Sequence, residues 1–115
     1  MPVTFANDAN AAAYGEFWRG AGAQHESMVL LTLGTGIGGG IIINDMLVEG
    51  AHSCGGECGH IIVNPAKDAW QDSLGNTGSL EAYACAGAVI RRATDMLGAS
   101  EASSLARRHR TGEIL

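Results

Sequence analysis

The stretch Leu33-Gly34-Thr35-Gly36-Ile37-Gly38-Gly39-Gly40 decides how the rest of the sequence is interpreted. Apolar runs precede it at 28–33 and follow it at 41–43, which predicts a strand, a glycine turn and a second strand over roughly 27–44. Glycine permits positive φ and lets a ligand approach the backbone closely. Successive turn N–H groups and the Thr35 hydroxyl can then converge on one anion, which predicts a phosphate cradle. A glycine-rich hairpin whose packing needs small residues is the competing interpretation, and this stretch alone leaves both open.

Motifs and composition exclude several functional classes. No Gly-Lys-Ser/Thr follows the glycines, so this is not a Walker A loop, and Gly34-x-Gly36 does not open a helix as a Rossmann loop would. The formal net charge of −5 over 115 residues argues against a nucleic-acid partner. No apolar segment approaches membrane-spanning length. Three cysteines, an odd number, predict free thiols in a reducing cytoplasm, so we expect a cytoplasmic protein of one modest domain or part of a larger one.

A cluster of polar residues stands at the start of a predicted helix. A short extended segment is expected at 2–5, followed by Asn7-Asp8-Ala9-Asn10 and a run of alanines. Alanine is the strongest helix former, so we expect a helix from Ala9 to Arg19 that ends at Gly20. Asp8 is either the cap of this helix or a catalytic base, because α/β proteins bind ligands beyond the carboxyl ends of their strands.

The loop at 49–60 carries more chemistry than a connection needs, with two His, two Cys and two Glu. A tetrahedral zinc site needs four ligands, whereas Cys54, Cys58 and His60 supply three, so spacing alone is a weak metal signal. Glu57 and His60 instead suit a site that brackets a hydroxylated ligand. Downstream we expect a tight turn at 44–45 and short strands at 47–48 and 61–63, then a loop at 66–78 and helices at 80–97 and 101–109. Ser79 is the expected cap of the first of these helices, and Glu81 lies in its first turn.

Three groups of residues, in this order and spacing, carry a family resemblance: 7–12 (NDANAA), 33–40 (LGTGIGGG), and 56–60 (GECGH) with 78–84 (GSLEAYA). Together they resemble the ROK family of sugar kinases and sugar-responsive repressors, and within it the bacterial glucokinases. The resemblance covers nearly the whole chain. It implies an α/β fold of the actin-like, ribonuclease-H-like ATPase type, here incomplete. Residues 1–115 would be the central part, with the catalytic helix and the start of the C-terminal domain, while an N-terminal ATP loop and the C-terminal remainder are missing.

The resemblance also implies roles for individual residues. Asp8 would be the general base that takes the proton from the sugar hydroxyl. The positions that hydrogen-bond the sugar match Asn7, Glu57, His60 and Glu81, and the loop facing the ATP phosphates matches Gly34, Thr35 and Gly36. The implied reaction is Mg²⁺- and ATP-dependent phosphorylation of a hexose such as glucose, impaired in a fragment. The alternatives are the sugar-sensing portion of a ROK repressor and a folded remnant with neither activity, and the family implies a homodimer as the assembly to test.

One departure from the family pattern concerns zinc. Family members usually bind zinc through the histidine that matches His60 and three cysteines in the following loop. Those cysteine positions hold Asp72, Leu74 and Ser79 here, and leucine cannot bind zinc. We therefore expect no structural zinc, and the loop at 65–78 must keep its shape by other means or be mobile.

Overall fold

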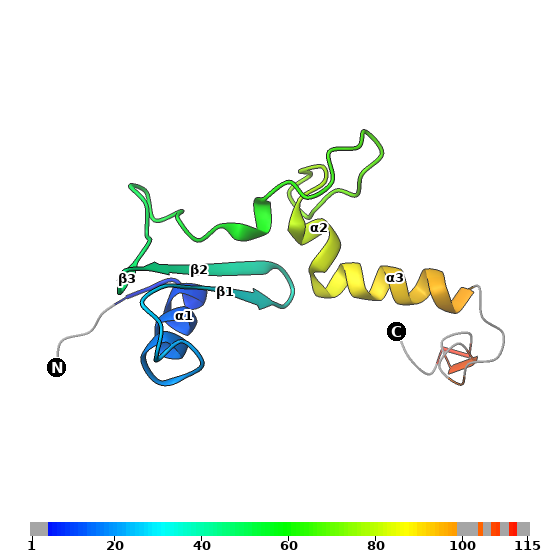
Figure 1. Cartoon of the computed structure of the whole chain (residues 1–115). Coiled ribbons are helices and arrows are strands. Elements are labelled where there is room, and N and C mark those ends of the chain that lie inside the picture. Colours follow the sequence, from blue (N-terminus) through cyan, green and yellow to red (C-terminus); the bar gives the residue numbers. More distant parts are fainter. Residues whose placement is uncertain (1–4, 99–103, 105–106, 109–110, 113–115) are drawn as a thin grey trace.

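A computed structural model describes residues 5–98, 104, 107–108 and 111–112. In chain order the elements are α1 (Asp8–Arg19), β1 (Met28–Leu33), β2 (Ile37–Ile43), β3 (Met46–Leu47), the 3-10 turn η1 (Cys58–His60), α2 (Leu80–Ala84) and α3 (Ala86–Gly98). Helix α1 lies against one side of the β1–β2 hairpin, and the segment after β3 crosses the other side (Figure 1). The extended segment expected at 2–5 and the helix expected at 101–109 fall mostly outside the described residues.

The sheet is antiparallel throughout, in the order β1-β2-β3. Strand β1 pairs with β2 from Met28↔Ile42 to Leu33↔Ile37, which confirms the hairpin predicted around the glycine turn. Asn44 and Asp45 connect β2 to β3 with φ of 49° and 64°. Positive φ at both positions is the type I′ geometry of a two-residue hairpin, which asparagine and aspartate tolerate, so the tight turn predicted there is also confirmed.

The second half of the glycine stretch is required for packing on both faces of β2. On the α1 face, a Cβ on Gly40 would lie 2.3 Å from the Cβ of Ala13, closer than two carbon atoms can approach. On the opposite face, a Cβ on Gly39 would lie 2.5 Å from the carbonyl oxygen of Gly56. The packing interpretation therefore holds at these two glycines, and the close approach brings the start of α1 and the loop at 53–57 to the same strand.

Strand β2 is largely covered on both faces, whereas one face of β1 is exposed. Ile42 on β2 is 1 % exposed, whereas the outward residues of β1 are 43–68 % exposed among the described residues: Val29, Leu31 and Leu33. The strand expected at 61–63 is wrong. Ile62 forms only an isolated bridge with Ser79, because the chain turns into α2 immediately after that residue and offers no further partner.

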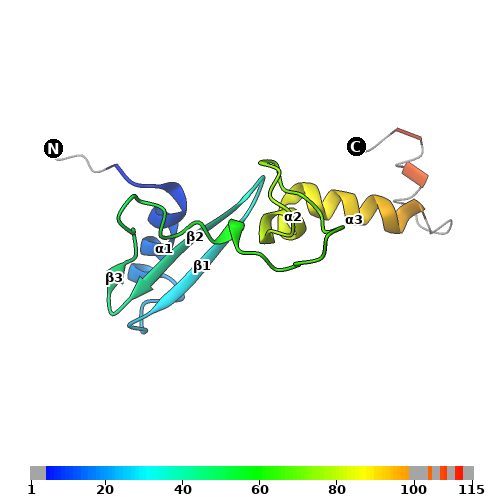
Figure 2. The same cartoon turned by 90° about the horizontal axis from the view of Figure 1, so that it is seen from above.

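The single helix expected over 80–97 is instead two helices that meet at Cys85. Cys85 is extended, with ψ of 168°, which ends α2 at Ala84. The N–H of Ala86 then donates to the carbonyl of Gly34 at 2.8 Å and no longer continues the α2 ladder. The break therefore joins the helical part to the glycine turn, and α3 extends away beyond that turn (Figure 2). In the part of the chain that the structure describes, no helix is long and apolar enough to cross a membrane.

Candidate functional site

Asn7, and not Asp8, caps helix α1. The Asn7 Oδ1 accepts hydrogen bonds from the N–H groups of Ala9 at 3.0 Å and Asn10 at 3.2 Å. Asp8 is the first helical residue, and its Oδ1 also accepts from Ala9 N, at 2.8 Å. Capping therefore does not require Asp8, whose exposed carboxylate sits at the positive end of the helix dipole with Oδ2 available to a ligand.

Asp8 lines three cavities, two of which join the predicted site residues to it. The first is a small, polar one of about 80 Å³ between α1, β2 and the loop at 53–57, and the predicted residues Asn7, Asp8 and Glu57 line it. The second is an open cleft of about 500 Å³ beside the glycine turn, lined by Asp8, Gly34, Thr35, Gly36 and Glu81 among others. The carboxylate predicted to act as base thus lies between the predicted sugar residues and the predicted phosphate turn.

The glycine turn is held in place from behind, by α2. Glu81 Oε2 accepts a hydrogen bond from Ile37 N at 3.0 Å, and its other oxygen accepts from the Ser73 hydroxyl at 3.2 Å. A Cβ on Gly36 would lie 2.5 Å from Glu81 Oε2, so a larger residue there would displace the Glu81 carboxylate from Ile37 N. Neither Gly34 nor Gly36 has positive φ, so steric room, and not a left-handed backbone, is the reason for glycine at Gly36.

The turn keeps two donors for a ligand. Gly34 N bonds to Gly36 O at 3.0 Å, and Ile37 N is taken by Glu81. Among the described residues, the N–H groups of Thr35 and Gly36 have no partner, and Thr35 is exposed. Free backbone N–H groups beside a hydroxyl are the donor set that an anionic oxygen needs. This donor set suits a phosphate at Thr35 and Gly36, whereas the Gly34 N–H is not free to join it, so the phosphate role of the turn stays a prediction.

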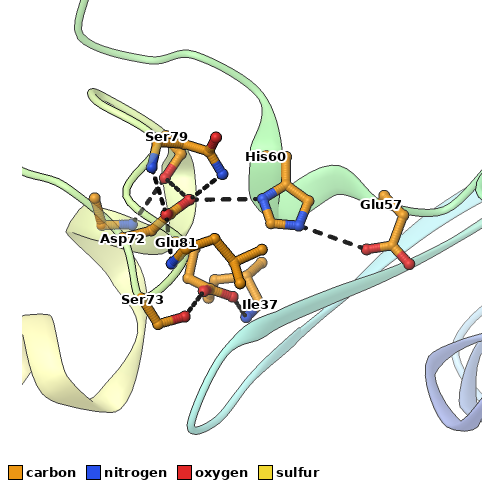
Figure 3. A network of polar contacts seen from close by, with 10 residues as sticks. Ile37, Glu57, His60, Asp72, Ser73, Ser79 and Glu81 are labelled. Atoms are coloured by element: carbon orange, nitrogen blue, oxygen red, sulfur yellow. Dashed lines mark hydrogen bonds and ion pairs between the residues drawn. The ribbon is translucent and has the colours of Figure 1, made fainter.

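The structure places His60 next to Glu57 but divides the predicted sugar residues into two groups. His60 Nε2 lies 3.9 Å from Glu57 Oε2, and Glu57 lines the small cavity. Glu81 lines the open cleft on the other side of Asp8. On the side away from Glu57, His60 Nδ1 lies 3.6 Å from Asp72 Oδ2, as Figure 3 shows.

Asp72 is the main residue that sequence reasoning missed. Its side chain is 0 % exposed and accepts four hydrogen bonds, from Leu74 N, Asn76 N, Asn76 Nδ2 and Ser79 Oγ. Removal from water raises the pKa of the Asp72 carboxyl, but these hydrogen bonds, led by those from Asn76, outweigh it and lower the pKa to about 2. The turn signal at Gly75-Asn76 was visible in the sequence. The sequence showed Asp72 only as a residue that replaces an expected cysteine, and gave no sign that its carboxylate organises the loop.

Asn10 is a second residue that the sequence did not single out as a ligand. It is 7 % exposed and lines the small cavity, and its Oδ1 has no hydrogen-bond partner within the described part of the chain. A buried, unpaired amide oxygen beside a polar cavity is an acceptor for a ligand hydroxyl or a water molecule. Its position two residues after Asp8 was the only available signal.

The residues around His60 do not fit a metal ion. Leu74 has no donor atom, and the Ser79 hydroxyl already donates to Asp72 at 2.8 Å. No group of three or more His, Cys, Asp or Glu residues capable of holding a metal occurs among the residues described here. Cys54, Cys58 and Cys85 are free thiols, as predicted, and Cys58 is buried. The expected absence of zinc stays a prediction.

Comparisons with known proteins give the family of the chain. The ROK family profile matches residues 1–115. A glucokinase of Halalkalibacterium halodurans is 45 % identical over 106 residues, which are 92 % of this chain and 32 % of that enzyme. A crystal structure of a ROK family glucokinase from Streptomyces griseus, in complex with glucose and AMPPNP, superposes with a TM-score of 0.78 at 44 % identity, over 87 % of this chain and 31 % of that one. The xylose repressor of Bacillus subtilis is 38 % identical over 91 residues, which are 79 % of this chain and 23 % of the repressor.

Proposed function

The chain belongs to the ROK family, and we propose that it carries the general base and the phosphate-facing turn of an ATP-dependent hexose kinase of the glucokinase type. It spans about a third of the length of the glucokinases it matches, so the activity, the hexose and the actin-like two-domain fold of the whole protein are all part of this proposal. The proposed reaction transfers the γ-phosphoryl group of ATP to the 6-hydroxyl of glucose.

The position of Asp8 between the two cavities is the observation that supports this proposal most directly. Asn7, Glu57 and the Asp8 carboxylate surround the small polar cavity, which suits sugar hydroxyls. The open cleft begins at the same carboxylate and continues to the glycine turn. A hydroxyl held against Asp8 can give up its proton there while its oxygen faces the cleft. A positioned general base of this kind contributes about 10²–10⁴-fold in rate.

The glycine turn would receive the phosphates. Thr35 N–H, Gly36 N–H and the Thr35 hydroxyl provide the donors, and Glu81 and Ala86 fix the turn from behind. ATP would be bound with Mg²⁺, which neutralises charge on the phosphates. Phosphoryl transfer depends mainly on such positioning, so efficient turnover needs both substrates to be held from more than one side.

A sugar-sensing segment of a ROK repressor is the second candidate, because the xylose repressor of Bacillus subtilis is almost as similar to this chain as the glucokinases are. A repressor needs the sugar cavity but neither the general base nor the phosphate turn. This chain has an Asp8 that the helix cap does not require and a turn with two open N–H donors. These two features favour the kinase.

The test is ADP release by the full gene product with Mg-ATP and a panel of hexoses, compared with Asp8→Asn. We expect the variant to lose turnover by about 10²-fold or more while its hexose affinity stays within a few-fold. Asp45→Asn is the matched control, because Asp45 is exposed in a turn that asparagine tolerates. Undiminished activity of Asp8→Asn would overturn the assignment of the base. Hexose binding without any turnover in the unmodified protein would favour the repressor.

A further inference from the structure

We propose that Asp72 is a positioning residue for His60, which holds the imidazole with its Nδ1–H directed at the loop and its Nε2 as an acceptor on the Glu57 side. The residues concerned come from three separate segments, namely η1, the loop before α2 and the start of α2 (Figure 3). The role of Nε2 toward a sugar hydroxyl rests on the proposed function. The orientation of the imidazole ring is independent of the proposed function, because it is argued from the contacts of His60 alone.

The choice of ring nitrogen follows from what faces each side of His60. Nδ1 lies 3.6 Å from Asp72 Oδ2, and an ionised carboxylate can accept a proton but cannot donate one. The Asp72 side chain is 0 % exposed, so little water screens its attraction for an N–H at this distance. Nε2 lies 3.9 Å from Glu57 Oε2, but the Glu57 side chain is 54 % exposed, so water screens that carboxylate much more than it screens Asp72. The neutral imidazole is therefore stabilised with its proton on Nδ1, which leaves the Nε2 lone pair for a donor.

Asp72 is rigid enough for this task. Its Oδ1 accepts from Leu74 N at 3.0 Å and from Asn76 N at 2.8 Å, which closes the loop around the carboxylate. Its Oδ2 accepts from Asn76 Nδ2 at 3.0 Å and Ser79 Oγ at 2.8 Å, so the oxygen that faces His60 is fixed from two further directions. A carboxylate fixed in this way orients a histidine more precisely than one on a free side chain.

The same contacts connect His60 to the rest of the candidate site. Ser79, which donates to Asp72, also caps α2 by accepting from Ala82 N at 3.3 Å. The first turn of α2 carries Glu81, which holds the glycine turn through Ile37 N. Asp72 thus sets the position of His60 relative to the helix that carries Glu81. Two residues predicted to contact the substrate are aligned through one carboxylate.

The test reads the tautomer of His60 directly, by long-range ¹H–¹⁵N correlation spectra of the ¹⁵N-labelled chain at a pH where the imidazole is neutral. We expect the Nδ1–H form in the unmodified chain. Asp72→Asn should shift His60 toward the Nε2–H form that free histidine prefers, because an amide N–H can donate to Nδ1. The exposed residues His25 and His52 serve as internal controls, and Asp68→Asn, in the same loop and exposed, is the matched control variant.

An Nε2–H form of His60 in the unmodified chain would overturn the inference. This measurement does not depend on whether a variant folds. A tautomer that does not respond to Asp72→Asn would overturn it as well. In the full gene product, Asp72→Asn should raise KM for the hexose about tenfold with kcat within a few-fold, as for loss of one hydrogen bond to the bound substrate. A tautomer shift in a protein that binds no hexose would support the positioning role and would refute the proposed function instead.

Discussion

The two halves of the described chain are held together by different physical means. The half formed by α1 and the hairpin is held by steric fit, in which alanines of α1 meet glycines of β2 at distances that no larger side chain allows. The half formed by the loop at 64–79 and α2 is held by donor–acceptor pairs around Asp72 and Tyr83. Both halves place a carboxylate at the open cleft, Asp8 from the first and Glu81 from the second. The same site is thus supported from one side by packing and from the other by polar contacts.

The contacts in the second half show what holds the loop at 65–78 in the absence of the expected cysteines. The Tyr83 hydroxyl accepts from Asn64 Nδ2 at 2.7 Å and from Trp70 N at 3.0 Å. The rings of Trp70 and Tyr83 stack at 5.1 Å, and the Arg91 guanidinium lies 3.9 Å from the Trp70 ring. The loop expected to be mobile or held by other means is held by these contacts and by the hydrogen bonds to Asp72.

Alanine substitution of glycine should have its largest effect in the half that depends on steric fit. Gly40→Ala would place a methyl group 2.3 Å from the Ala13 Cβ and should destabilise the fold by about 1–3 kcal/mol. Gly15→Ala is the matched control, since Gly15 lies in α1 with nothing within 4 Å of the added atom. It should stabilise the fold by about 0.5–1 kcal/mol. Urea unfolding followed by circular dichroism measures both, and effects of the same sign would contradict the steric account.

A smaller loss is expected when one polar contact is removed from the other half. Tyr83→Phe keeps the stack on Trp70 but leaves the two donors of the hydroxyl unpaired. Both donors are only partly buried, so water can replace part of the lost hydrogen bonding. We expect the free energy of unfolding to fall by about 1–2 kcal/mol. Tyr14→Phe, at an exposed residue, should stay within about 0.5 kcal/mol. Equal unfolding midpoints for the two variants would show that the Tyr83 hydroxyl does not anchor the loop.

The two halves also differ in how far the sequence predicted them. Periodicity and glycine placement gave the hairpin and α1 to within a residue, because helix propensity, capping and strand alternation are local properties. The break at Cys85 was missed, since it depends on a hydrogen bond from Ala86 to Gly34, about fifty residues away. The role of Asp72 was missed for the same reason, because a carboxylate among turn residues reveals its value only when His60 and Ser79 are brought to it.

Acid should weaken the second half through Asp72. The folded chain lowers the pKa of Asp72 from its usual 3.8 to about 2, so the contribution of the ionised carboxylate is fully present above about pH 4 and is lost as the pH falls toward 2. The stability difference between the unmodified chain and Asp72→Asn should therefore be constant above pH 4 and shrink below it. Urea unfolding at a series of pH values, followed by Trp70 fluorescence in a Trp18→Phe background, measures this difference. If the stability curves of the unmodified chain and Asp72→Asn stay parallel down to pH 2, the hydrogen bonds to Asp72 do not stabilise its charge. The control Asp68→Asn should have the same stability curve as the unmodified chain.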